Sequence, residues 1–370
     1  MENGKGSARV ELANDTIVFS FPEVHPEARL RVTFQRTLRI PDDGRAYDLP
    51  PGLGSFPLRP VDDYPIQVPP AWRRHGGVMT PMHRAEALWI ESTSDEIENH
   101  DAPYPFAVAV GCGRINAVSG TRWTSLLRRR PSQNYLVVPE QTWLDGFSVD
   151  RGVIRQFVAM PLGEGATAEE QIAGSGETGG IQIQVRPMRR EVFEKRFPFR
   201  YSYPEATPRQ YPYVTEAPAT YEMGLAAGGR MRQQIAADPY LLADWERGQR
   251  GRCFVHLATA EEWWRITGAN PPETPVTARA YADAGLKWFS WYDESLVPLQ
   301  GSRRLASLKS VADVARKKHR KLPPGNEPAD VKHVVPLSPQ PPPWQNDAFQ
   351  PRWNGPGNRR LDSRGPGPQE

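Results

Sequence analysis

The stretch ARLRVTFQRTLRI, residues 28–40, decides the fold class of this chain. Its apolar residues hold even positions (30, 32, 34, 38 and 40), and Arg, Thr and Gln hold the odd ones. An alternation with period two is typical of a strand with one buried face. Arg36 interrupts the apolar face, so we expect a β-bulge there or two strands.

Strand patterns of the same kind surround this stretch, from TIVFSF at residues 16–21 to GGIQIQVRPM at residues 179–188. WLDGFSV and VIRQFVAM are separated by Asp150-Arg151-Gly152, which predicts a hairpin. No long helical pattern separates successive strands. The N-terminal half therefore predicts a mainly antiparallel β-sheet or sandwich.

The second half has helical patterns. GGRMRQQIAADPY, residues 228–240, predicts a short helix that stops before Pro239. RCFVHLATAEEWWRITG predicts a strand and then a helix that begins at Thr259, with Glu262 completing a capping box, and ends at Gly268. TARAYADAG repeats this device with Thr277 and Gly285. A last helix is expected in SRRLASLKSVADVARKKHR, with a small apolar stripe.

We therefore expect an α+β fold whose short helices lie in the C-terminal half and whose Pro-rich C-terminal tail is disordered. The tail has 12 prolines among 49 residues and few apolar side chains, so burial cannot offset its ordering entropy. Residues 1 to about 10 are expected to be disordered as well. The expected regions are an N-terminal segment with one edge strand (1–27), a β-rich region (28–197), a Tyr/Pro-rich strap or linker that packs through Tyr203, Tyr211 or Tyr213 (198–220), a mainly helical region (221–321) and the tail (322–370).

Composition limits the classes of function. A formal net charge of +3 over 370 residues argues against nucleic-acid binding as the main function. No stretch approaches the roughly 18 consecutive apolar residues of a membrane span, and the first residues lack a secretory signal. The two cysteines, Cys112 and Cys253, are expected to be buried free thiols in a reducing compartment, so a cytoplasmic location is expected.

A glycine-rich loop, PLGEGATAEEQIAGSGETGGIQI at residues 161–183, resembles a nucleotide-binding loop only in part. Thr167 and Glu170 form a capping box that predicts the start of a helix in this loop. A dinucleotide site needs a full helix after the glycines, whereas Gly174 ends this one after AEEQIA. No Gly-Lys-Ser/Thr occurs either. No cofactor is therefore expected, and two alternatives remain: a surface loop with one helical turn, or an anion site in which Gly163, Gly165 and Thr167 present N–H groups.

The other candidate chemistry is sparse. No histidine or cysteine spacing fits a metal site, so no metal is expected. His256 is expected to be a satisfied core histidine. PEQTWLDGFSVDRG, residues 139–152, is the densest mixture of carboxylates and aromatic rings, in which Trp143 could contact a ligand and Asp145 could act as an acid or base, with Glu140 or Asp150 as its partner. Turn and sheet-edge acids explain the same residues. Arg155 and Arg186 are candidates to hold an anion near the loop.

These observations favour a soluble, non-catalytic protein that binds a ligand or a partner as a scaffold, because every strong catalytic motif is missing. The alternative is an enzyme that acts on an anionic or sugar-like small substrate with Asp145 and nearby Arg and loop N–H groups. A protein partner could use the basic helix at 303–321, which has eight Lys/Arg and one Asp, or the Pro-rich tail. An anionic small molecule is the other candidate partner.

Overall fold

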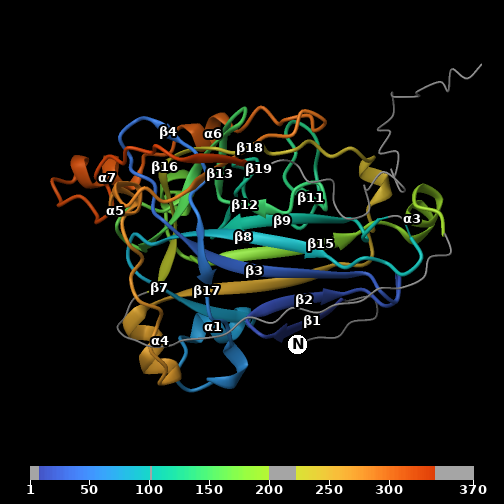
Figure 1. The fold of residues 1–370 in the computed structure, drawn as a ribbon. Helices are drawn as coiled ribbons and strands as arrows, with labels where there is room; N and C mark the ends of the chain where they lie inside the picture. The colour runs from blue at the N-terminus through green and yellow to red at the C-terminus, as the bar shows by residue number, and fades with distance from the viewer. Residues whose placement is uncertain (1–7, 101, 200–221, 338–370) are drawn as a thin grey trace, which may run out of the picture.

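The computed structural model describes residues 8–100, 102–199 and 222–337 (Figure 1). The strands are β1 (Arg9–Ala13), β2 (Thr16–Ser20), β3 (Arg29–Thr37), β4 (Ala46–Tyr47), β5 (Gly52–Ser55), β6 (Arg59–Pro60), β7 (Val78–Met82), β8 (Ala87–Ser94), β9 (Phe106–Cys112), β10 (Ile115–Asn116), β11 (Leu136–Val138), β12 (Trp143–Leu144), β13 (Gly146–Asp150), β14 (Val153–Pro161), β15 (Ile181–Pro187), β16 (Met223–Arg232), β17 (Gly251–Thr259), β18 (Trp288–Trp291) and β19 (Val334–Leu337). The helices are short: α1 (Pro70–His75), α2 (Ala168–Ala173), α3 (Arg190–Arg196), α4 (Ala260–Thr267), α5 (Ala278–Asp283), α6 (Arg303–Ala306), α7 (Val311–Lys317) and the 3₁₀ turns η1 (Val61–Asp63) and η2 (Leu242–Asp244).

The described strands form one mainly antiparallel network. A continuous path of antiparallel pairs runs β1–β2–β3–β8–β14–β16–β17–β15–β9–β11. The first strand of this path also lies beside β17 within it, because the N–H of Ala8, just before β1, donates to the carbonyl of Arg250, just before β17 (3.4 Å). The mainly antiparallel β-structure and the few short helices confirm the coarse fold prediction.

β3 has the expected alternation, with Leu30, Val32 and Phe34 fully buried. These side chains share one hydrophobic core with residues of β9, β15 and β17, so strands far apart along the path bury a common interior. At Arg36 the pairing with β8 is regular, whereas the pairing with β5 shifts between Gln35 and Thr37. The expected irregularity therefore lies on one side of the strand only.

Several local predictions are confirmed. β13 and β14 form the hairpin, with Gly152 at φ 69° in its turn. Thr167 caps α2 and Glu170 completes its capping box. Thr259 caps α4 and Gly268 ends it, but no reciprocal bond from Glu262 completes a capping box there. Thr277 caps α5.

The helix expected at 228–240 is wrong: β16 continues to Arg232, and the chain beyond it is not helical. The physical reason is close packing of its glycines. A Cβ on Gly229 would lie 2.3 Å from the Pro41 carbonyl oxygen, and one on Gly228 would lie 2.6 Å from Val158 Cγ2. Glycine thus lets β16 approach its neighbours closely. The helical spacing of the apolar residues gives no sign of this packing.

The single basic helix expected at 303–321 is also wrong, because the segment forms two helices, α6 and α7. Ser310 begins the second helix with a capping box of its own, completed by Asp313. The side chains of Leu305, Leu308, Val311, Ala312 and Ala315 are nevertheless buried, so the predicted apolar stripe is present over two helices.

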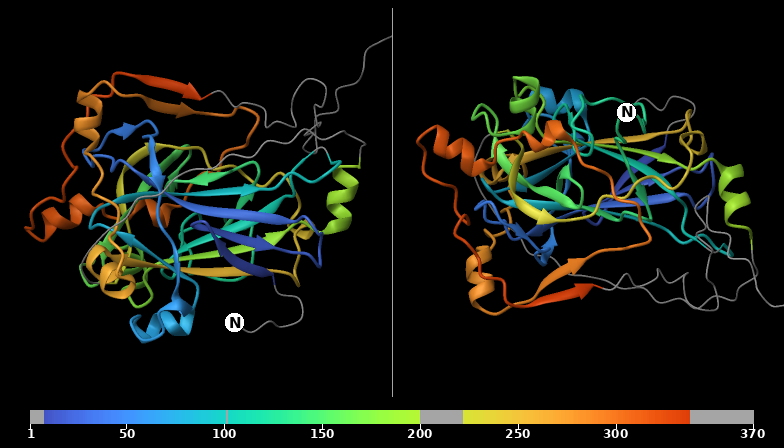
Figure 2. Two further views of the ribbon diagram at one scale, coloured as in Figure 1. Left: turned by 60° about the horizontal axis from the view of Figure 1, so that its bottom comes forward. Right: turned by 90° about the horizontal axis from the view of Figure 1, so that it is seen from above.

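Residues 8–10 and 322–337 are ordered, although disorder was expected there. Arg9 and Val10 belong to β1, which pairs with β2 through a turn at Asn14 and Asp15, both with positive φ. Residues 322–337 pack on the body: Arg39 donates to the Pro324 carbonyl (2.6 Å), and β19 pairs in parallel with β18. Figure 2 shows this pair to one side of the main strands. Tyr203, Tyr211 and Tyr213 of the expected strap, and residues 338–370 of the tail, lie outside the described residues.

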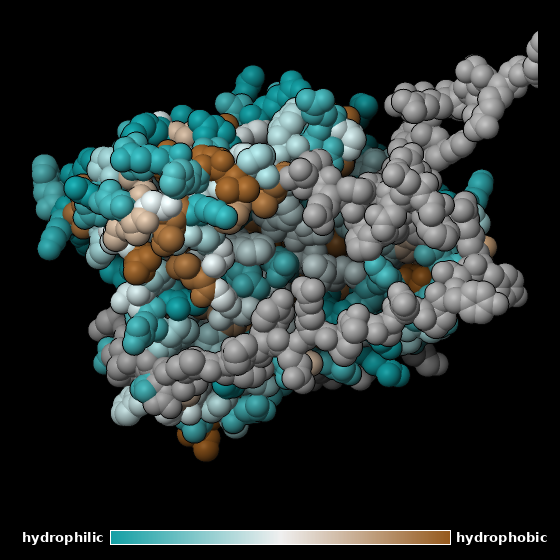
Figure 3. All heavy atoms as spheres, viewed as in Figure 1, coloured by the Kyte–Doolittle hydropathy of each residue, from teal (hydrophilic) through white to brown (hydrophobic). Residues whose placement is uncertain are grey.

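No helix in the described part of the chain combines the length and apolar character needed to cross a membrane. The face seen in Figure 3 is mostly hydrophilic, and its largest apolar area lies over β18 and β19. Val334 and Leu337 of β19 are 38% and 40% exposed.

Candidate functional site

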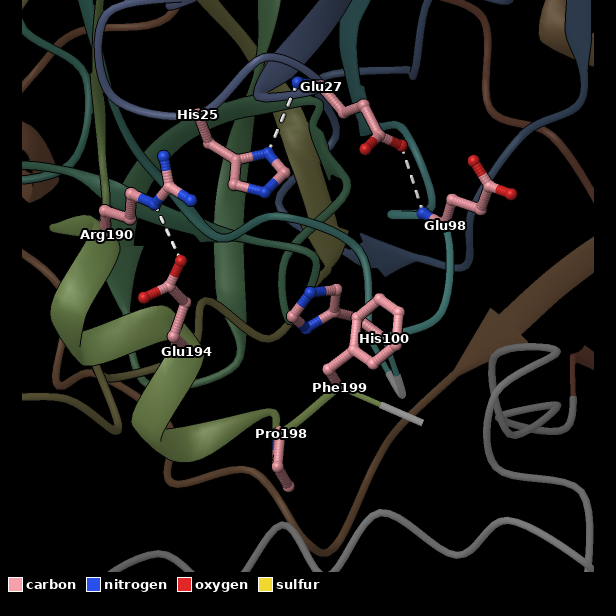
Figure 4. Close-up of a pocket in the computed structure, with 8 residues that line it drawn as sticks. All are labelled: His25, Glu27, Glu98, His100, Arg190, Glu194, Pro198 and Phe199. Atoms are coloured by element: carbon pink, nitrogen blue, oxygen red, sulfur yellow. Dashed lines mark hydrogen bonds and ion pairs between the residues drawn. The ribbon is translucent and has the colours of Figure 1, made fainter. Parts of the chain in front are cut away.

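Three segments far apart in the sequence meet at one end of the strands and enclose a hollow of about 420 Å³ (Figure 4). They are the loop between β2 and β3, the segment between β8 and β9, and helix α3 with the residues that follow it. We call this feature the histidine hollow; its lining residues are His25, Glu27, Glu98, His100, Arg190, Glu194, Pro198 and Phe199.

His25 stands in a tight loop between two prolines, Pro22 and Pro26. Its backbone N–H donates to the Phe21 carbonyl (3.0 Å), and the loop closes with a bond from Phe21 N–H to the Ala28 carbonyl (3.0 Å). The side chain is only 7% exposed. These bonds fix the position of a nearly buried imidazole at the edge of the hollow.

Phe193 of α3, which is fully buried, packs against both histidines of the hollow and against Tyr104. Its ring centroid lies 5.9 Å from that of His25, 4.9 Å from that of His100 and 4.4 Å from that of Tyr104. His100 also forms a backbone β-bridge with Phe199, which ties the segment before β9 to the chain after α3. The hollow is therefore held by packing as well as by hydrogen bonds.

The charges around the hollow are unbalanced. Glu27, Glu98 and Glu194 supply three carboxylates, whereas Arg190 supplies one guanidinium, bonded to Glu194 (Nε–Oε1 2.7 Å). Burial lowers the pKa of His25 below its ordinary value, against the effect of Glu27. His25 is therefore neutral at pH 7, and the surroundings attract a cation rather than an anion.

The site residues expected from the sequence lie in three separate places. Trp143, in β12, packs edge-to-face against Trp291 (centroids 5.0 Å apart). Asp145 follows where the chain changes partners from β8 to β14; it is 5% exposed, and its carboxylate accepts a hydrogen bond from Gln233. Burial raises the pKa of Asp145 from 3.8 to about 7, although the Gln233 bond opposes this.

Arg155 is not beside the glycine-rich loop. It lies near the other end of β14, where Nη1 contacts Asp42 (3.8 Å) and donates to the Gly228 carbonyl (3.3 Å). Arg186 donates to the carbonyls of Glu246 and Arg247 (2.9 and 2.8 Å). Both guanidinium groups thus already bind groups of the chain away from the loop.

The N–H groups of the loop are occupied by the chain's own carboxylate. Glu170 accepts hydrogen bonds from the backbone of Gly163 (2.7 Å), Gly165 (2.9 Å) and Thr167 (3.0 Å). Partial burial raises the pKa of Glu170, but these bonds outweigh it and lower the pKa below its ordinary value. An external anion would have to displace Glu170, so the geometry favours a structural loop over an anion site.

Replacing Glu170 with alanine is expected to lower the free energy of unfolding by about 1–3 kcal/mol, because three backbone donors and a helix cap lose their acceptor. Urea unfolding measures this loss. Glu191→Ala is the matched control: this glutamate also lies in a first helical turn, but its side chain is 80% exposed and its ion pair is long (3.7 Å). Equal stability of the two variants would show that Glu170 does not hold the loop.

A second buried polar group lies beneath β11 and β12. Asp238 accepts from the Tyr135 hydroxyl (2.5 Å), from Trp245 Nε1 (3.0 Å) and from the Tyr240 N–H (2.7 Å). Burial raises the pKa of nearby Glu140 to about 8, opposed by its own backbone N–H and by the Tyr240 hydroxyl. Neither Asp145 nor Glu140 raises the pKa of the other, so the two acids do not act as a coupled pair.

The remaining candidates are structural. His256 is 2% exposed, stacks on Trp72 (4.6 Å) and contacts the Gly76 carbonyl (3.1 Å); burial lowers its pKa to about 3. The prediction of a satisfied core histidine is confirmed. Cys112 and Cys253 are buried and free, as expected. Among the described residues, no three His, Cys, Asp or Glu side chains are grouped to hold a metal.

Sequence reasoning did not single out the histidine hollow. His25, His100 and Arg190 are too far apart in the chain for any spacing rule to join them, and none stands in a recognisable motif. Comparison with family models, with curated proteins and with solved structures finds no match for this chain.

Proposed function

We propose that this protein is a non-catalytic binding protein and that the histidine hollow binds a small organic cation. The observation that carries the proposal is the excess of carboxylates over cationic groups in a concave site with an aromatic wall. Glu27, Glu98 and Glu194 attract a positive charge, and the rings of His25, His100 and Phe199 line the same hollow. A volume of about 420 Å³ suits a small molecule.

The alternative, an enzyme that uses Asp145 on an anionic or sugar-like substrate, has weaker support. Asp145 is nearly buried and bonded to Gln233, so a substrate would have to displace protein groups to reach it. Arg155 and the loop N–H groups are already bonded to other groups of the chain. An anionic ligand also fits the charge of the hollow poorly.

The proposal is tested by calorimetric titration of the full chain at pH 7.5 with choline and with inorganic phosphate. Choline is expected to bind saturably and phosphate is not. Glu27→Gln and Glu194→Gln are expected to weaken choline binding about three- to tenfold, because each removes one negative charge. Glu191→Gln, on α3 but outside the hollow, is the matched control and is expected to bind like the wild type. Absence of choline binding, or equal effects of all three variants, would contradict the proposal.

Cation binding is also expected to weaken as the pH falls below about 6.5. The pKa of His25 lies below that ordinary value, because burial lowers it and Arg190 and His100 add to the effect, while Glu27 and Glu194 oppose them. His25 is neutral above its pKa and gains a positive charge below it, which repels a bound cation. Titrations at pH 7.5, 6.5, 5.5 and 5.0 measure the dependence; an unchanged dissociation constant over this range would show that the cation binds away from His25.

A further inference from the structure

The two imidazoles of the hollow are held in opposite tautomers by the backbone. In His25, Nδ1 accepts a hydrogen bond from the N–H of Glu27 (3.2 Å). A nitrogen that accepts an N–H carries no proton, so the proton of the neutral ring is on Nε2. His25 therefore offers a donor at Nε2.

In His100 the assignment is reversed. Nδ1 lies 2.7 Å from the carbonyl oxygen of Phe197, which can only accept. Nδ1 must therefore carry the proton, and Nε2 of the neutral ring has a free lone pair. His100 offers an acceptor at Nε2.

The rings face the same space. Their centroids are 6.2 Å apart and their planes are nearly perpendicular (88°), with Phe193 against both. Figure 4 shows the two rings as neighbours, each with one ring nitrogen on the side that faces the other ring. Within the described ranges, neither Nε2 has a hydrogen bond to the protein. Nε2–H of His25 as a donor and Nε2 of His100 as an acceptor are thus both available to one small polar group.

A hydroxyl group fits this pair because it accepts from Nε2–H of His25 and donates to Nε2 of His100. An ammonium only donates, a carboxylate or ether only accepts, and an alkyl group does neither. The carboxylates of Glu27, Glu98 and Glu194 stand around the same space for a positive charge. We infer that the ligand is an amino alcohol, with its hydroxyl between His25 and His100 and its ammonium group among the carboxylates. This inference rests on the proposed function, since it names the chemical class of the cation.

The test compares three quaternary ammonium probes of similar size by calorimetry: choline, its methyl ether, and propyltrimethylammonium. Choline is expected to bind at least tenfold more tightly than either analogue, since a site built to bond a hydroxyl leaves polar groups unpaired without it. Equal binding of all three overturns the inference but leaves the proposed cation site intact. No binding of any probe overturns the proposed function.

Two variants and an NMR measurement of the histidine tautomers complete the test. His100→Gln is expected to remove most of the preference for choline over propyltrimethylammonium while retaining binding of both. His333→Gln, at an exposed site outside the hollow, is expected to keep the preference. If His100→Gln fails to fold, imidazole nitrogen NMR of the wild type decides: His25 must be protonated at Nε2 and His100 at Nδ1. The same tautomer in both rings overturns the inference whether or not a probe binds.

Discussion

Replacing Asp238 with alanine is expected to lower the free energy of unfolding by about 3–5 kcal/mol, the largest loss among the changes considered. One carboxylate, 3% exposed, accepts from Tyr135, Trp245 and the Tyr240 backbone. Without it, three buried donors lose their acceptor where water has little access, and each costs its desolvation free energy.

Urea unfolding of the Asp238→Ala variant measures this loss. Asp283→Ala is the matched control, because Asp283 is 61% exposed and makes only a helical surface ion pair with Arg279 (3.5 Å); its effect is expected to stay within about 0.5 kcal/mol. Tyr135→Phe completes a double-mutant cycle with Asp238→Ala, and the two effects are expected to be non-additive. Additive effects, or an Asp238 variant as stable as the control, would contradict the assigned role.

The second large effect is a gain. Asp145→Asn is expected to stabilise the protein above pH 7 by up to about 4 kcal/mol relative to wild type. The folded-state pKa of Asp145, about 7, lies above its ordinary value of 3.8, so the folded state holds this proton more tightly than the unfolded state. Its contribution to stability is complete below about pH 4 and is lost as the pH rises toward 7. Asparagine has no proton to lose, and its carbonyl oxygen can still accept from Gln233.

The measurement is urea unfolding of both proteins at pH 4, 5, 6, 7 and 8. The difference in stability is expected to grow from pH 4 to pH 7 and then remain constant. Asp150→Asn, at the exposed end of β13, which begins next to Asp145, is expected to follow the wild-type pH dependence. A constant difference between Asp145→Asn and wild type over the whole range would mean that Asp145 ionises normally.

The sequence predicts correctly those features that depend on residues close together in the chain. The alternation of β3, the caps at Thr167, Thr259 and Thr277, and the β13–β14 hairpin all depend on residues a few positions apart. The prediction of a helix at residues 228–240 is wrong because this segment pairs with β14 and packs against the backbone near Pro41. Both partners are distant in the sequence, so the local pattern does not reveal them.

The candidate site follows the same division. The sequence identifies Asp145 as an unusual acid, but nothing local reveals that Gln233, from a segment 88 positions away, fills its hydrogen bond. The sequence predicts that the loop N–H groups are available to an anion and that Glu170 belongs to a helix cap, but not that Glu170 itself accepts from those N–H groups. The histidine hollow depends on two connecting segments and helix α3, which the sheet brings together, so its residues form a site only after folding.

Several early segments of this chain bond to segments that are synthesised much later. β7 pairs with β17, whose residues lie 177 positions later in the chain, and Arg39 bonds to the carbonyl of Pro324, 285 positions later. β3 and β8 can pair while the chain is still being synthesised. The hydrophobic core that they share with β15 and β17 is not complete until residue 259 has been added. The apolar faces of the early strands are therefore open to solvent for most of translation. The first third of the chain therefore completes its fold only when the last third is present. A prematurely terminated chain exposes strand edges that can pair with other chains.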